Sequence, residues 1–121
     1  MRESHKQDRI VLASETRTAD ATGSIYAGTI GGLFVIDVTA ASATPSVVFT
    51  IRGITAEGNN YTILQSAAIT ATGVTVLKVH PSLTASANSV AKDILPGAIE
   101  VFADHADADS ITYSVQFIGV N

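Results

Sequence analysis

Apolar and polar residues alternate along much of this chain, and this alternation constrains its fold more than any other feature. Successive side chains of a β-strand point to opposite faces, so a period of two places every second residue on one side of a sheet. Phe34, Ile36 and Val38 form such a face, and residues 47–52 and 111–117 repeat the pattern. No segment shows the apolar period of a helix of normal length. The sequence therefore predicts an all-β fold.

The composition agrees with this prediction and favours a single domain. The chain has 121 residues, of which 46% are hydrophobic and only 15% are charged. Small and β-branched residues supply most of the apolar content, as is typical of strands. A chain of this length can bury one sizeable core. Because cysteine is absent, the fold must be held by packing, without disulfides or thiolate metal sites.

Turn signals recur about every ten residues and divide the chain into short strands. Glycine, asparagine and proline mark residues 57–60, 72–73, 80–81 and 95–97. This spacing predicts an antiparallel β-sandwich or small barrel of about seven or eight strands. Three hairpins are expected, which would pair residues 47–52 with 61–64, 67–71 with 74–79, and 98–103 with 111–120. The expected core comprises Phe34, Ile36, Phe49, Ile51, Val76, Val101, Val115 and Phe117.

The N-terminal segment differs in composition from the rest of the chain. Residues 1–20 hold four basic and four acidic side chains, whereas the remainder is poor in charge. This difference predicts an extended N-terminal arm over residues 1–21, followed by one β domain over residues 22–121. The arm would order on a partner by backbone pairing and burial of its apolar patch. Its candidate interaction residues are Arg9, Ile10, Val11, Leu12 and Arg17.

Several function classes find no support in the sequence. The net charge of −4 gives no basic excess for nucleic acid, and no apolar run is long enough to span a membrane. Residues 28–32 are rich in glycine but lack the lysine of a phosphate-binding loop. No serine elbow or paired histidine motif is present, so we expect no catalytic residue, no metal and no cofactor.

One acidic segment merits a metal hypothesis. Asp104, His105, Asp107 and Asp109 lie close together, and alternating carboxylates can converge on a hard cation such as Ca²⁺. Their spacing does not fit an EF-hand loop. Acidic residues are also ordinary formers of β-turns, where they cap their own backbone. We favour this structural interpretation of the segment.

The order of segments resembles that of small structural proteins encoded among the virion genes of tailed phages, particularly phages of actinobacteria. The resemblance covers most of the chain and lies in the shared order of its pieces. After Leu95-Pro96 the chain departs from the pattern, since relatives often continue with an aromatic and a basic residue. The matching pieces lie within residues 12–19, 32–39, 61–67, 72–81, 95–96 and 111–115.

The resemblance implies a head decoration (cement) protein without enzymatic activity. Such a protein would bind the major capsid protein on the capsid exterior of the virion, after synthesis in the cytoplasm of the bacterial host. It would act as a homo-oligomer, preferably a trimer, because several weak contacts to a lattice reinforce one another. A tail-associated structural protein and a carbohydrate-binding β-sandwich module are the alternatives.

Overall fold

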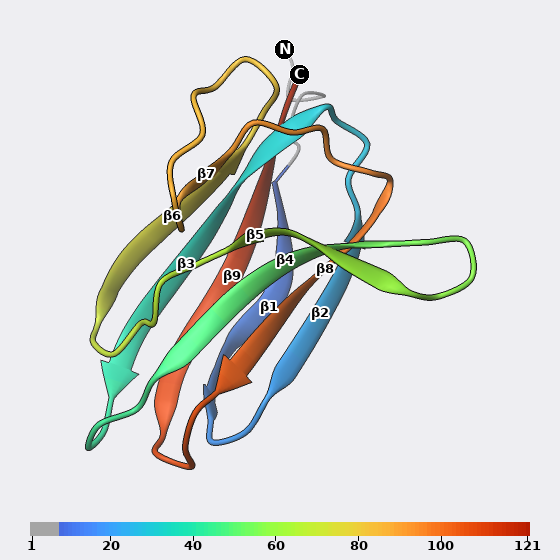
Figure 1. Ribbon diagram of the computed structural model, residues 1–121. Coiled ribbons are helices and arrows are strands. Elements are labelled where there is room, and N and C mark those ends of the chain that lie inside the picture. The colour runs from blue at the N-terminus through green and yellow to red at the C-terminus, as the bar shows by residue number, and fades with distance from the viewer. Residues whose placement is uncertain (1–7) are drawn as a thin grey trace.

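Two β-sheets packed face to face make up the structure, a computed structural model that describes residues 8–121 (Figure 1). The five-stranded sheet has the spatial order β1-β9-β3-β6-β7, and the four-stranded sheet has the order β2-β8-β4-β5. All neighbours are antiparallel except β6 and β7. In chain order the strands are β1 (Asp8–Arg17), β2 (Ala21–Tyr26), β3 (Gly31–Ala41), β4 (Val47–Ile54), β5 (Asn60–Gln65), β6 (Gly73–Val79), β7 (Val90–Ala91), β8 (Ala98–His105) and β9 (Ile111–Val120).

The prediction of an all-β sandwich is confirmed. Strands β2 to β9 provide the eight strands expected of the body, and β1 adds a ninth. Within residues 8–121 no helix is long and apolar enough to span a membrane.

The core lies between the two sheets and is built from the alternating residues that the sequence indicates. Seven of the eight expected core residues are buried there. Aromatic rings join the layers: the centroids of Phe49 on β4 and Tyr113 on β9 lie 5.0 Å apart, edge to face. Phe34 and Phe117 pack side by side in the five-stranded sheet, with centroids 5.1 Å apart. Such pairs add to the stabilisation that burial of their area provides.

Val76 is the exception among the expected core residues. In the β3–β6 pair Leu77 lies opposite the buried Phe34, whereas Val76 lies opposite Val35 on the other face of the sheet. Leu77 and Val79 are the β6 side chains that enter the core. The prediction was wrong because β6 carries apolar residues on both faces, so its pattern does not fix which face is inward.

Two of the three predicted hairpins are also wrong. β4 and β5 do pair, but β8 and β9 lie in different sheets, so the turn between them crosses the sandwich. β6 pairs with β3, and residues 67–71 contribute only an isolated bridge between Ile69 and Val47. Alternation locates a strand but does not identify its neighbour, because it reports only which side chains are buried.

The expectation of an N-terminal arm needs a correction over residues 8–21. Residues 1–7 lie outside the part of the chain that the structure describes. β1 is an integral strand, paired with β9 from Asp8 opposite Ile118 to Arg17 opposite Ile111. The chain then turns into β2 at the edge of the other sheet (Figure 1). This segment therefore belongs to the β body, and its charges lie along an edge strand, where charged side chains are common.

Candidate interaction surfaces

The five candidate residues of the predicted arm all lie on β1, and the structure gives them different environments. Val11 and Leu12 are buried in the core, so they cannot form an exposed apolar patch. They are adjacent in sequence and still both buried because the register with β9 shifts on either side of Leu12. Ile10, in contrast, is 61% exposed. Of the apolar patch 10–12, only Ile10 is available to a partner.

Arg9 makes its contacts within its own chain. Its Nη2 donates a hydrogen bond of 2.6 Å to the carbonyl of Ala27, which directly follows β2. Its guanidinium also lies over the ring of Phe117, 5.5 Å from the centroid. A charged donor on a backbone carbonyl is a comparatively strong hydrogen bond. Arg9 therefore ties the start of β1 to the end of β2.

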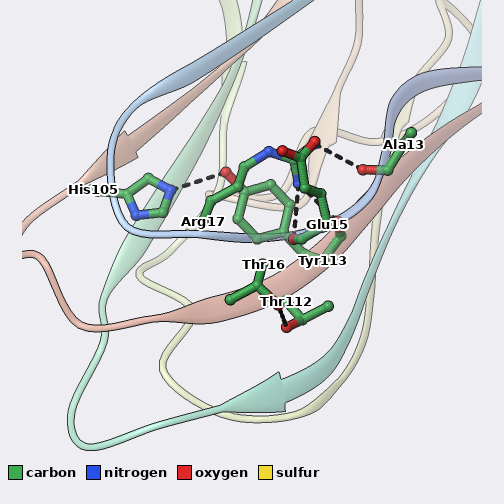
Figure 2. Close-up of polar contacts among 7 residues, drawn as sticks. All are labelled: Ala13, Glu15, Thr16, Arg17, His105, Thr112 and Tyr113. Carbon is green, nitrogen blue, oxygen red and sulfur yellow. Dashed lines mark hydrogen bonds and ion pairs between the residues drawn. The ribbon is translucent and has the colours of Figure 1, made fainter.

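Arg17 holds the irregular part of β1 against β9, as Figure 2 shows. Its Nη1 donates to the carbonyl of Tyr113 at 2.9 Å, and its Nη2 donates to the carbonyl of Ala13 at 2.7 Å. Its guanidinium carbon lies 4.6 Å from the Tyr113 ring centroid. The second register shift in β1 falls between Leu12 and Glu15, so the carbonyl of Ala13 lies where the ladder is interrupted. The planar fork of arginine suits this double contact.

His105 and Tyr113 form the most strongly perturbed titratable pair. The His105 Nε2 and the Tyr113 hydroxyl lie 2.9 Å apart (Figure 2). Burial lowers the pKa of His105 below its ordinary value. Burial also raises the pKa of Tyr113 to about 12. Tyr113 is fully buried, so a substrate cannot reach its hydroxyl. The geometry suits a structural hydrogen bond better than proton transfer.

The acidic segment between β8 and β9 uses its carboxylates to hold the backbone. The Asp109 Oδ2 accepts hydrogen bonds from the backbone N–H and the hydroxyl of Thr44, each at 3.2 Å. The Asp107 Oδ1 accepts from the backbone N–H of Asp109 at 3.0 Å. Within residues 8–121 no group of three acidic or histidine side chains is arranged to hold a metal ion.

The outward side of the four-stranded sheet carries an ion pair between Arg52 and Glu100. Arg52 Nε lies 3.1 Å from the Glu100 carboxylate, although its N–H is not aligned for a hydrogen bond, so the contact is an ion pair. The guanidinium also lies over the Phe102 ring, 4.4 Å from the centroid. Both charges are thus compensated within the sheet.

The outward side of the five-stranded sheet carries apolar residues on four strands, set among polar residues such as Gln116, Asp37 and Lys78, and we call it the outer face. Its strand registers form a grid of rows. Leu33 lies between Ile118 and Lys78, and Val35 lies between Gln116 and Val76. Ile10 extends the second row on β1, and Val74 lies opposite Asp37 in a third row. The apolar members of the outer face are Ile10, Leu33, Val35, Val74, Val76 and Ile118.

An open pocket of about 430 Å³ continues the outer face towards the C-terminus. His80 borders it, and the His80 Nδ1 accepts a hydrogen bond from the backbone N–H of Ser82 at 3.1 Å. The pocket is therefore an apolar hollow with a polar rim. Its lining residues are Gly32, Leu33, Lys78, Val79, His80, Ser82, Leu83, Val120 and Asn121.

A second apolar surface lies at the end of the sandwich where β2 ends and β8 begins. Exposed fractions there are 72% for Tyr26, 46% for Ile30, 61% for Ile94 and 39% for Val120. The backbone holds this region together, since the N–H of Leu95 donates to the carbonyl of Ile30 at 2.8 Å. We call Tyr26, Ile30, Ile94 and Val120 the apolar end; it lies at the top of Figure 1, where the C-terminus is marked.

The chain matches no protein-family model, and no curated protein or solved structure is significantly similar to it.

Sequence reasoning missed both apolar surfaces, although one of them left a signal. Residues 33–36 are four consecutive apolar residues. Such a run places apolar side chains on both faces of the strand. An antiparallel sheet usually exposes one face to solvent, so the run indicates that both faces of this sheet are covered by protein. The apolar end left no comparable signal, because its residues come from separate loops and strand ends.

Proposed function

We propose that this chain is a bacteriophage structural protein without catalytic activity or cofactor, and specifically a capsid decoration protein. It acts as a homo-oligomer bound to the major capsid protein on the exterior of the virion. The resemblance in segment order supports the virion setting. The apolar end supports a function in protein contact and is the observation that carries the proposal.

Ile30 and Ile94 line one open pocket, and the Tyr26 ring lies against Gly97, which borders the same pocket. A contiguous apolar patch of this kind commonly marks an interface with another protein. Aromatic residues are favoured at the energetic centre of such interfaces, and Tyr26 is the most exposed large apolar residue of the part described. We therefore assign the capsid contact to the apolar end, with Tyr26 at its centre.

The arrangement of tyrosines weakens the carbohydrate-binding alternative. A sugar platform needs exposed aromatic rings on one surface. Tyr26 and Tyr61 are the exposed aromatic residues of the described chain, and they lie on β2 and β5, the opposite edges of the four-stranded sheet. Three strand spacings, roughly 14 Å, separate these edges. In addition, the Tyr61 ring lies over Gly53 on the core side, so the two rings do not share a platform.

Electron cryomicroscopy of the virion tests the location. We expect density for the β-sandwich on the outside of the capsid. Finding the chain only in the tail would overturn the capsid assignment, whereas the proposal of a virion structural protein would stand. Absence of the chain from purified particles would overturn the proposal as a whole.

A binding experiment tests the contact surface. The variant Tyr26→Ser should bind capsids that lack the native protein at least about tenfold more weakly, as expected for an interface anchor. Tyr61→Ser is the matched control, because Tyr61 is also exposed but lies at the other edge of the sheet. Equal binding of the two variants would remove the apolar end as the capsid contact.

A further inference from the structure

The outer face has the character of a surface that is covered by protein. Ile10 and Val74 are 61% and 62% exposed, and the other apolar members of this face are partly exposed. The outward side of the four-stranded sheet carries the ion pair between Arg52 and Glu100, with the Arg52 guanidinium over the Phe102 ring. An antiparallel sheet that faces water normally presents polar residues on that side. On the five-stranded sheet, four adjacent strands each place at least one exposed or partly exposed apolar residue on that side.

We infer that the outer face binds the outer face of a second copy of this chain, related by a two-fold axis that runs parallel to the strands. This inference specifies the homo-oligomer within the proposed function, but it does not depend on the virion setting. The two copies would meet row against row, with the outer face of one turned onto the outer face of the other.

Rotation about an axis parallel to the strands keeps each row in place and reverses its order. β1 of one copy then lies over β6 of the other, and β9 lies over β3. In the first row Ile118 meets the second copy's Leu33, and the acidic position Asp8 meets the basic position Lys78. Each of these contacts occurs twice, as two-fold symmetry requires.

The remaining rows match in part. In the second row Ile10 meets Val76 of the other copy, and Gln116 meets Val35. In the third row Ser114 meets Asp37 of the other copy, so a polar residue meets a polar one. Ile118 with Leu33 and Ile10 with Val76 therefore join apolar residues of the two copies, and opposite charges meet at both margins. This agreement is the self-complementarity that an isologous interface needs.

The alternative two-fold axis, perpendicular to the strands, gives a poor match. It exchanges the first and third rows, so Leu33 would meet Asp37 and Ile118 would meet Ser114. Lys78 would then cover Val74. Each of these three contacts would set a polar or charged group against an apolar side chain, which costs free energy. The register therefore selects the axis parallel to the strands.

The size of the outer face agrees with a dimer of moderate affinity. Four strands spaced about 4.8 Å apart and about nine residues long give a face of roughly 600 Å². Two such faces reach the lower end of the area range of specific interfaces. We therefore expect a dissociation constant of the order of 1 μM. A two-fold dimer replaces the trimer suggested by the resemblance, because a three-fold ring joins two different surfaces, whereas this face matches itself.

Sedimentation of the full chain over a range of concentrations tests the dimer. We expect a monomer–dimer equilibrium, and Val35→Lys should raise the dissociation constant by about 100-fold because it buries a charge at the interface. Val48→Lys is the matched control: Val48 is partly exposed on the outward side of the other sheet, opposite Asp104. Circular dichroism shows whether both variants keep the β fold.

Three outcomes would overturn the inference: a monomer at all concentrations, a trimer, or equal effects of the two lysine variants. If Val35→Lys does not fold, Lys78→Glu provides the same test, because it places a negative charge over Asp8 in both copies. None of these outcomes depends on capsid binding, so failure of the dimer and failure of the proposed function can be distinguished.

Cysteine pairs test the orientation of the axis. The described chain and the full sequence contain no cysteine, so an introduced thiol is unique. Ile10→Cys mixed with Val76→Cys should be joined by a short bifunctional thiol reagent, since these positions face each other about 10 Å apart across packed sheets. Neither variant alone should be joined, because equivalent positions lie three strands apart. Cross-linking of either variant alone would overturn the proposed axis.

Discussion

Gly23 on β2 packs directly against the backbone carbonyl of Val11 on β1, with no space left for a side chain. These two strands are the edge strands of different sheets. Their contact closes the sandwich along this side without a shared ladder of hydrogen bonds. The carbonyl of Val11 lies in the part of β1 where the register with β9 shifts, so the irregular strand and the glycine together allow the approach.

The variant Gly23→Ala should therefore lower the free energy of unfolding by about 1–3 kcal/mol, because the added methyl group forces the two edges apart. The sign is informative, since replacement of a strand glycine without steric conflict is stabilising. Chemical denaturation measures the effect. Ser24→Ala, at the exposed neighbouring position, should change stability by less than about 0.5 kcal/mol. Unchanged or increased stability of Gly23→Ala would show that β1 does not pack as described.

Arg17→Lys should destabilise the fold by about 1–3 kcal/mol although it keeps the positive charge. A single ammonium group cannot reach the carbonyls of Ala13 and Tyr113 with the geometry of the guanidinium fork. Thermal unfolding measures the loss. Glu15→Gln is the control, since Glu15 lies 3.6 Å from the Arg17 guanidinium and is 68% exposed, and such an exposed pair contributes little. If Arg17→Lys were as stable as the native chain, the anchoring function of Arg17 would be wrong.

The lowered pKa of His105 makes stability fall under mildly acidic conditions. In the unfolded chain His105 titrates near its ordinary value of about 6.5, so between that pH and its lower native pKa the unfolded state binds more protons. Stability therefore rises with pH in this window and falls on acidification below about pH 6.5. His105→Gln should show a smaller fall in the unfolding midpoint between about pH 7 and pH 5. An identical pH dependence of the two proteins would contradict the burial of this imidazole.

Tyr113 gives the opposite dependence at alkaline pH. Its native pKa of about 12 lies above its unfolded value, so the native state retains a proton that the unfolded state loses. The stabilising contribution is complete below about pH 10 and is lost as the pH rises towards 12, at roughly 1.4 kcal/mol for each pKa unit. Tyr113→Phe should unfold at a higher pH than the native chain, as circular dichroism can follow. If the native chain and Tyr113→Phe unfold at the same alkaline pH, groups other than Tyr113 cause the alkaline unfolding.

The sequence predicted the strands best where one face of the strand is buried and the other is exposed to solvent. Phe49 and Ile51 are buried as expected, because the polar Thr50 and Arg52 alternate with them and mark the outward face. Phe34 and Ile36 are buried as expected as well, since Asp37 and Thr39 mark the outward face of the same strand although Leu33 and Val35 are apolar. Which β6 residues face the core could not be predicted, since Val74 and Val76 are as apolar as Leu77 and Val79. The faces are distinguished only by the pairing of β6 with β3, which is a tertiary relationship.

β1 and the interaction surfaces could not be predicted for related reasons. The bulges around Leu12 interrupt the alternation of β1, and its charges resemble those of a solvated segment. The pairing of β1 with β9 joins residues about one hundred positions apart, which local sequence does not encode. The outer face likewise depends on the register of four strands. Only Ile10, of the candidate interaction residues, lies on it.

The acidic segment between β8 and β9 provides the last test, because its carboxylates either hold the turn or bind a cation. Asp109→Ala should lower the free energy of unfolding by about 1 kcal/mol, since it removes both hydrogen bonds from Thr44. Asp104→Ala, at an exposed position near the end of β8, should have an effect below about 0.5 kcal/mol. Calcium should leave the melting temperature unchanged, whereas a site with a dissociation constant of ~0.1 mM would stabilise the fold by ~2.7 kcal/mol at ~10 mM calcium. A rise in melting temperature with calcium that Asp109→Ala abolishes would show that the segment is a cation site, and the hydrogen bonds to Thr44 would then be a secondary feature of its geometry.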